Sequence, residues 1–166
     1  MAAVVAAFGH VEAIEEGAAV LAHADLRTAR PAGIDRPALV SLGPQLTGLL
    51  DLATTRDATW LDVIRQLRDQ RRPIYVELDA KTRRISQLLQ PLLQPVGDIR
   101  ENERGDMQVN FLLSHAVHVL HHGHPRFKEL LRLLRTAQKD ESMVWVVETL
   151  DSPTIVDVKP ADERLR

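Results

Sequence analysis

The most constraining feature of the sequence is a pattern that occurs twice. Residues 60–68 read WLDVIRQLR and residues 127–135 read FKELLRLLR, and seven of the nine positions agree in residue type. Each segment is followed by a strand-like stretch, PIYVELD in the first copy and MVWVVET in the second. The offset is 67 residues across the helical patterns and 70 across the strands, which predicts a three-residue insertion in the second helix–strand connection.

This repeat has two interpretations. It can be an internal duplication of a helix followed by a β-hairpin, with pseudo-repeats at 38–91 and 105–160. Alternatively, any two amphipathic helices with exposed arginines look alike, because 3.6-residue periodicity sets their apolar positions. In either case strands joined by short turns predict an antiparallel sheet. The expected fold class is therefore α+β, with helices packed on one face of the sheet.

The prolines suggest how the chain is divided. An apolar pattern at helical spacing over residues 10–28 predicts an N-terminal amphipathic helix, and the segment RPAGIDRP that follows is typical of a linker. A chain of 166 residues suits one compact domain or two small ones. The predicted parts are a helical segment at 1–30, a Pro-rich linker at 31–37, an α+β body at 38–160 and a loose tail at 161–166.

Composition excludes several classes of function. The absence of cysteine rules out disulfides, thiol catalysis and thiolate metal sites, and it fits a reducing cytoplasm. A net charge of −2 gives no general attraction to nucleic acid or to anionic membranes. No apolar stretch reaches the length of a membrane span, and the N-terminus is a poor signal peptide. A cytoplasmic protein without membrane association is expected.

Histidines are concentrated in residues 114–124, which hold five of the seven in the chain. On a helix, His115, His118 and His122 would share one face, and the last two would form an i, i+4 pair able to chelate a divalent transition metal. On a strand the same residues would split between two faces. The usual helical zinc motif also needs a glutamate beside its first histidine, where this chain has Val119.

Arginines repeat on the two predicted helices. Arg65 and Arg68 of the first copy align with Arg132 and Arg135 of the second, and packing does not explain them. They are candidate residues for binding a ligand or a partner, and two basic helix faces could also bind nucleic acid. Aromatic residues make up only 4% of the chain, so stacking platforms for bases are scarce and nucleic acid is disfavoured.

The sequence contains no complete catalytic motif, and it indicates no catalytic residue. The sequence therefore favours a non-catalytic cytoplasmic module that binds another protein or assembles with itself, without a cofactor. A metal-dependent enzyme or metal-binding protein using the histidines is one alternative. A nucleic-acid-binding protein using the arginine faces is the other.

Overall fold

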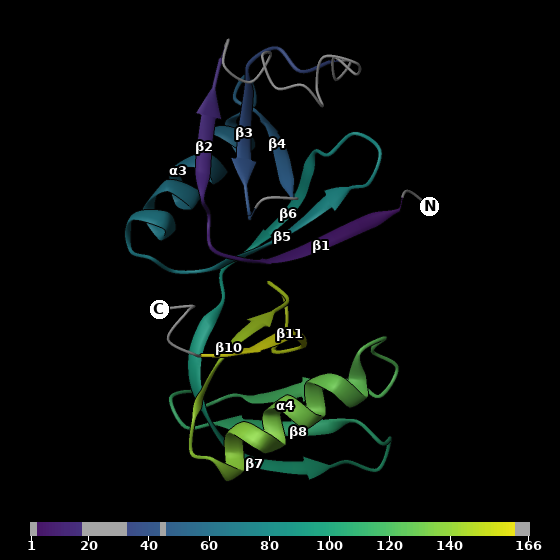
Figure 1. Ribbon diagram of the computed structural model, residues 1–166. Helices are drawn as coiled ribbons and strands as arrows, with labels where there is room; N and C mark the ends of the chain where they lie inside the picture. Colours follow the sequence, from purple (N-terminus) through teal and green to yellow (C-terminus); the bar gives the residue numbers. More distant parts are fainter. Residues whose placement is uncertain (1–2, 18–32, 44–45, 162–166) are drawn as a thin grey trace. The chain divides into compact units, whose positions relative to one another are not determined.

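The computed structural model describes residues 3–17, 33–43 and 46–161, which contain eleven strands and two helices. The chain divides into two units, Met1–Leu88 and Leu89–Arg166. Figure 1 shows the ribbon coloured along the sequence. The predicted body at 38–160 spans the boundary between the units.

The predicted α+β class is wrong, because the described residues are mostly strand and form three sheets. The predicted N-terminal helix is also wrong where it can be examined, since Ala13–Glu16 forms a strand; residues 18–28 lie outside the described part. The apolar residues that suggested a helix serve another purpose. Ile14 pairs with Val40 of a neighbouring strand, and this long-range pairing outweighs local helical spacing.

Unit 1 contains two three-stranded sheets, β1-β5-β6 and β2-β3-β4. β1 pairs antiparallel with β5, and β3 pairs antiparallel with both β2 and β4. A single parallel bridge between Leu49 and Arg84 connects β4 to the start of β6. The elements in chain order are β1 Val4–Gly9, β2 Ala13–Glu16, β3 Pro37–Ser41, β4 Thr47–Asp51, α3 Thr55–Asp69, β5 Ile74–Asp79 and β6 Ile85–Leu89.

Unit 2 contains one five-stranded sheet in the order β11-β10-β7-β8-β9. The long strand β7 pairs with β10 through its first residues and with β8 through its last ones. A parallel bridge between Val119 and Thr154 joins β9 to β11, the two outer strands. The elements are β7 Leu92–Glu101, β8 Met107–Phe111, β9 Val117–Leu120, α4 Phe127–Lys139, β10 Met143–Glu148 and β11 Ile155–Pro160.

The two units share one connectivity. In each, a first strand pairs with both the second and the fourth, the third strand bridges in parallel to the fifth, and a helix joins the third to the fourth. In unit 1 the first strand is interrupted and forms β1 and β2, whereas in unit 2 it is the continuous β7. Pairing therefore runs in a ring, which is the arrangement of the OB-fold, a five-stranded, partly open Greek-key barrel.

The segment from β4 to β6 in unit 1 corresponds to the segment from β9 to β11 in unit 2 at a constant offset of 70 residues. The same offset relates the C-terminal ends of α3 and α4. In both units a residue with positive φ lies two positions after the last helical residue, namely Arg71 (54°) in unit 1 and Glu141 (50°) in unit 2. Ile64 of α3 and Leu134 of α4 are both fully buried. The sequence match at an offset of 67 is therefore out of structural register, and Arg65 corresponds to Arg135 rather than to Arg132.

Each unit has its own apolar core. In unit 1, Leu61, Ile64 and Leu67 of α3 pack into a cluster with residues of β3, β4, β5 and β6. In unit 2, Leu130, Leu134 and Ala137 of α4 pack into a cluster with residues of all five strands. Neither described helix is long and apolar enough to cross a membrane.

Candidate functional site

Helix α4 presents two different faces because its apolar and basic residues alternate with the helical repeat. Leu130, Leu134 and Ala137 are buried in the unit 2 core. On the exposed side the basic residues recur at intervals of four, three and four positions, which places them along one side of the helix. This basic face consists of Lys128, Arg132, Arg135 and Lys139.

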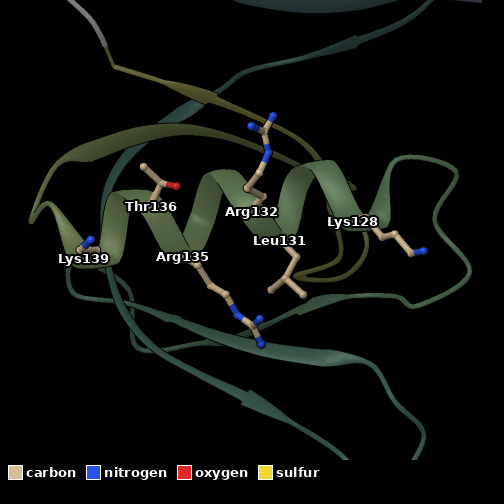
Figure 2. Close-up of a pocket in the computed structure, with 6 residues that line it drawn as sticks. All are labelled: Lys128, Leu131, Arg132, Arg135, Thr136 and Lys139. Atoms are coloured by element: carbon tan, nitrogen blue, oxygen red, sulfur yellow. The ribbon is translucent and has the colours of Figure 1, made fainter.

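The basic face lines a shallow open pocket of about 390 Å³ together with Leu131 and Thr136. Figure 2 shows the two lysines toward opposite ends of α4, with the two arginines and Leu131 between them. Leu131 is half-buried and packs against the unit 2 core, so it supplies an apolar part of the lining. The pocket therefore combines several positive charges with one aliphatic side chain.

None of these four cations forms an ion pair with a carboxylate in the described part of the chain. The acid nearest to them on α4 is Glu129, and its carboxylate is bound by Arg126 at 2.8 and 2.9 Å. This hydrogen-bonded pair lowers the pKa of Glu129, with a smaller contribution from the charge of Arg132. Glu129 is thus committed to Arg126, and the positive charge of the basic face stays largely uncompensated.

The arginines predicted on α3 lie in a different electrostatic setting. Arg65 forms ion pairs with Glu16 of β2 and with Asp62, one turn away on α3. Arg68 pairs with its neighbour Asp69 at 3.1 Å. The structure therefore separates the four predicted arginines: Arg132 and Arg135 line a common pocket, while Arg65 and Arg68 are paired on the other unit.

The three histidines predicted to hold a metal are not brought together. Val117–Leu120 is a strand, so the helical chelate does not form. His115 lies exposed in the β8–β9 loop, His118 is buried, and His122 is exposed and bonds to Asp106 at 2.9 Å. Within residues 3–17, 33–43 and 46–161, no group of three metal-binding side chains is placed to hold an ion.

Asp106 explains part of the histidine cluster. Its carboxylate accepts hydrogen bonds from the backbone N–H of His122 and from the ring of His122, and the ring of His121 lies 3.4 Å away. These contacts, led by the backbone hydrogen bond, lower the pKa of Asp106 to about 2. Asp106, which precedes β8, is therefore hydrogen-bonded to His122, which follows β9.

Sequence reasoning missed a polar group around His118. Its ring nitrogens contact Ser114 Oγ at 2.8 Å and the carboxylate of Glu148. Ser114 and His118 are four residues apart, but Glu148 lies on β10, 30 residues beyond His118. No local pattern links the three residues, since only the folded structure of unit 2 makes them neighbours.

Comparisons with known proteins give no family for this chain. No family model matches it, and no curated protein matches it significantly. Among solved structures, a mutant of pro-protein-glutaminase is similar over 46% of this chain and 27% of that chain, with 22% identity and a TM-score of 0.42.

Proposed function

We propose that this chain is a cytoplasmic interaction module, without membrane association, that binds an acidic segment of a partner protein through the basic face of α4. The observation that supports it is the row of four exposed cations with no carboxylate partner in the described part of the chain. A charged helix face in a monomer is usually balanced by nearby opposite charges. Helix α3 follows that rule and α4 departs from it.

The shape of the basic face suits a protein segment. Eleven residues separate Lys128 from Lys139, which corresponds to about 16 Å along a helix. About three turns of a helix with carboxylates at every third or fourth position would span that length. Arginine presents a planar fork of donors that matches a carboxylate, and Leu131 offers contact to an apolar side chain between the acids.

Nucleic acid fits the same face less well. The chain carries a net charge of −2, and aromatic side chains for stacking are few. None of the six residues that line the pocket is aromatic. A fold of this connectivity hosts many functions, so the argument rests on the site and not on the barrel.

The test compares two double variants of the same chemical kind. Arg132→Gln/Arg135→Gln removes half the charge of the basic face, and Arg65→Gln/Arg68→Gln removes two ion-paired arginines from α3. The probe is a fluorescein-labelled helical peptide with glutamates at i, i+4 spacing and leucines between them. Its affinity is measured by fluorescence anisotropy at low and at physiological salt.

We expect the α4 variant to bind about tenfold more weakly, since each exposed charge pair contributes up to about 1 kcal/mol. The α3 variant should bind like the unchanged protein, and added salt should weaken binding by the unchanged protein. Equal binding by both double variants would overturn the proposal. Tighter binding of a single-stranded oligonucleotide than of the peptide would also overturn it. The same holds if the protein binds no peptide because its molecules associate with one another through α4.

A further inference from the structure

The buried histidine of β9 lies between a hydroxyl group and a carboxylate. His118 is 4% exposed, its Nε2 lies 2.8 Å from Ser114 Oγ, and its Nδ1 contacts the carboxylate of Glu148. With the ring proton on Nδ1, the imidazole donates to Glu148 and accepts the Ser114 hydroxyl proton at Nε2. The ring of Phe111 packs against the imidazole at 4.8 Å in an edge-on contact, which further fixes its orientation.

Unit 1 fills the corresponding space without polar groups. The shift of 70 residues relates His118 to Gly48 and Glu148 to Leu78. A Cβ atom at Gly48 would lie 2.7 Å from the Ile85 side chain and 2.9 Å from that of Leu78, so Leu78 and Ile85 occupy the place of the imidazole. An apolar solution therefore exists for this fold at this position.

Packing accordingly does not explain the polar solution in unit 2. Withdrawing a histidine and a glutamate from water carries a desolvation cost that an apolar pair avoids. Polar groups kept at such a cost are common at sites that carry chemistry. The order hydroxyl, imidazole, carboxylate is the order in which a nucleophile, a general base and a residue that positions the base occur in acyl-transfer centres.

The surroundings of Ser114 indicate what would bind there. Ser114 is half-buried in the β8–β9 loop, and Leu112, Leu113 and Val117 close to it in the chain are 70%, 68% and 49% exposed. These aliphatic side chains suit an apolar acyl group. The backbone N–H of Ala116 donates a hydrogen bond to Ser114 Oγ at 3.2 Å, so one amide donor lies beside the carbonyl of an acyl group attached there.

We propose that Ser114, His118 and Glu148 form an acyl-transfer centre that hydrolyses esters of small apolar carboxylic acids. Ser114 Oγ bonds to the ester carbonyl carbon while His118 Nε2 takes the hydroxyl proton. The bond from that carbon to the leaving oxygen breaks, and His118 returns the proton to the departing alcohol. Water then attacks the acyl-serine carbon and gives one proton to His118. The bond from that carbon to Ser114 Oγ breaks, His118 returns the proton to Oγ, and the carboxylic acid leaves.

Glu148 acts as a positioning residue in this scheme. It holds the Nδ1–H tautomer and stabilises the imidazolium that forms during each step. The centre lies on β9, β10 and the β8–β9 loop, and it does not depend on the basic face of α4. Its failure would therefore leave the proposed partner binding unaffected.

The test uses the full chain and two probes. A fluorophosphonate labels serines that an adjacent base activates, and mass spectrometry locates the labelled residue. Hydrolysis of p-nitrophenyl butyrate then gives kcat and KM. The variants are Ser114→Ala, Glu148→Gln and, as a control, Ser86→Ala on the exposed part of β6 in unit 1.

We expect labelling at Ser114 in the unchanged protein and in the Ser86→Ala variant, and none in Ser114→Ala. Ser114→Ala should lower kcat by about a hundredfold, the range expected when acid–base assistance to a nucleophile is lost. Glu148→Gln should lower kcat with KM unchanged, and circular dichroism identifies any variant that fails to fold. Absence of Ser114 labelling, or ester hydrolysis that survives in a folded Ser114→Ala variant through the other histidines, would overturn the proposal.

Discussion

The two units have the same connectivity but handle polar groups in opposite ways. Unit 1 pairs the arginines of its helix with acids and fills the space beside β4 with aliphatic side chains. Unit 2 leaves four cations of its helix without carboxylate partners in the described part and places a buried histidine, paired with a half-buried glutamate, in the corresponding space. Because the fold tolerates both solutions, the connectivity does not require the polar features of unit 2, and the two proposals rest on this contrast.

The two tryptophans allow each unit to be followed separately. Trp60 belongs to α3 of unit 1, and Trp145 to β10 of unit 2. In a Trp60→Phe background the fluorescence reports unit 2, and in a Trp145→Phe background it reports unit 1. Urea unfolding followed in this way measures the free energy of unfolding unit by unit.

The largest effect is expected from removing one member of the His118–Glu148 pair. Glu148→Leu leaves the buried Nδ1–H of His118 without its carboxylate acceptor and should destabilise unit 2 by up to about 3 kcal/mol. The double variant His118→Gly/Glu148→Leu copies Gly48 and Leu78 of unit 1 and should recover most of that loss, as measured through Trp145. If the double variant were as unstable as the single one, the correspondence between the two sites would be refuted.

The reverse exchange concerns Gly48 of unit 1. Gly48→Ala places a Cβ against the Ile85 and Leu78 side chains and should cost about 1–3 kcal/mol through overpacking. Gly9→Ala is the matched control, because a Cβ at Gly9 meets nothing within 4 Å. Both are followed through Trp60. A Gly48→Ala variant as stable as the control would show that unit 1 can accommodate a side chain at the position of His118.

A smaller effect is expected at the start of the helices. Thr54 Oγ1 accepts the Asp57 N–H at 3.2 Å and caps α3, whereas Arg126, the N-cap residue of α4, makes no side-chain hydrogen bond of this kind. Thr54→Ala should destabilise unit 1 by about 1 kcal/mol. Thr59→Ala, on the exposed middle of α3, should change the free energy of unfolding by less than about half of that. Equal losses in the two variants would argue against a capping role.

The smallest effect is expected from the acid dependence of unit 2. Because folding lowers the pKa of Asp106 from 3.8 to about 2, its ionised carboxylate stabilises unit 2 above the unfolded pKa. That contribution is lost as the pH falls from 3.8 toward 2. Asp106→Asn should therefore lower stability near neutral pH and flatten its pH dependence in this window.

His122→Ala provides the matched control for Asp106. It removes the ring but keeps the backbone N–H, which is the largest cause of the lowered pKa. The variant should retain most of the acid dependence that Asp106→Asn loses. Urea midpoints at pH 6 and near pH 2.5, read from Trp145, distinguish the two outcomes. An unchanged pH slope in Asp106→Asn would contradict this assignment.

The regular elements with strong local signals could be predicted from the sequence. The helical patterns at 60–68 and 127–135 lie within α3 and α4, and the strand-like stretches PIYVELD and MVWVVET contain β5 and β10. Periodic apolar residues and a proline define these elements locally. The short strand β2 forms because β3, distant in the sequence, pairs with it, so its local helical periodicity is misleading. For the histidine segment the periodicity left helix and strand open, and pairing with the neighbouring β8 makes it the strand β9.

The candidate sites could be predicted only in part. Arg132 and Arg135 were identified by their helical spacing, but that spacing cannot distinguish them from Arg65, whose partner Glu16 is 49 residues away. The sequence pattern indicates that His118 is a metal ligand because it does not reveal the contact with Glu148. That residue lies 30 positions away in the sequence and contacts His118 only in the folded chain. The sequence indicates an offset of 70 only for the strands that follow the helices. The parallel bridges extend this offset to β4 and β9, and only then does Gly48 correspond to His118.

The ring of pairings also bears on how the chain acquires its structure. Two copies of one connectivity in a single chain could exchange strands, a known failure of repeated domains. Each ring here forms within a continuous stretch, residues 4–89 for unit 1 and residues 92–160 for unit 2. During synthesis, β1 can find β5 before β10, the corresponding strand of unit 2, has been made. The order of translation thus separates the copies in time and protects the chain from mispaired intermediates.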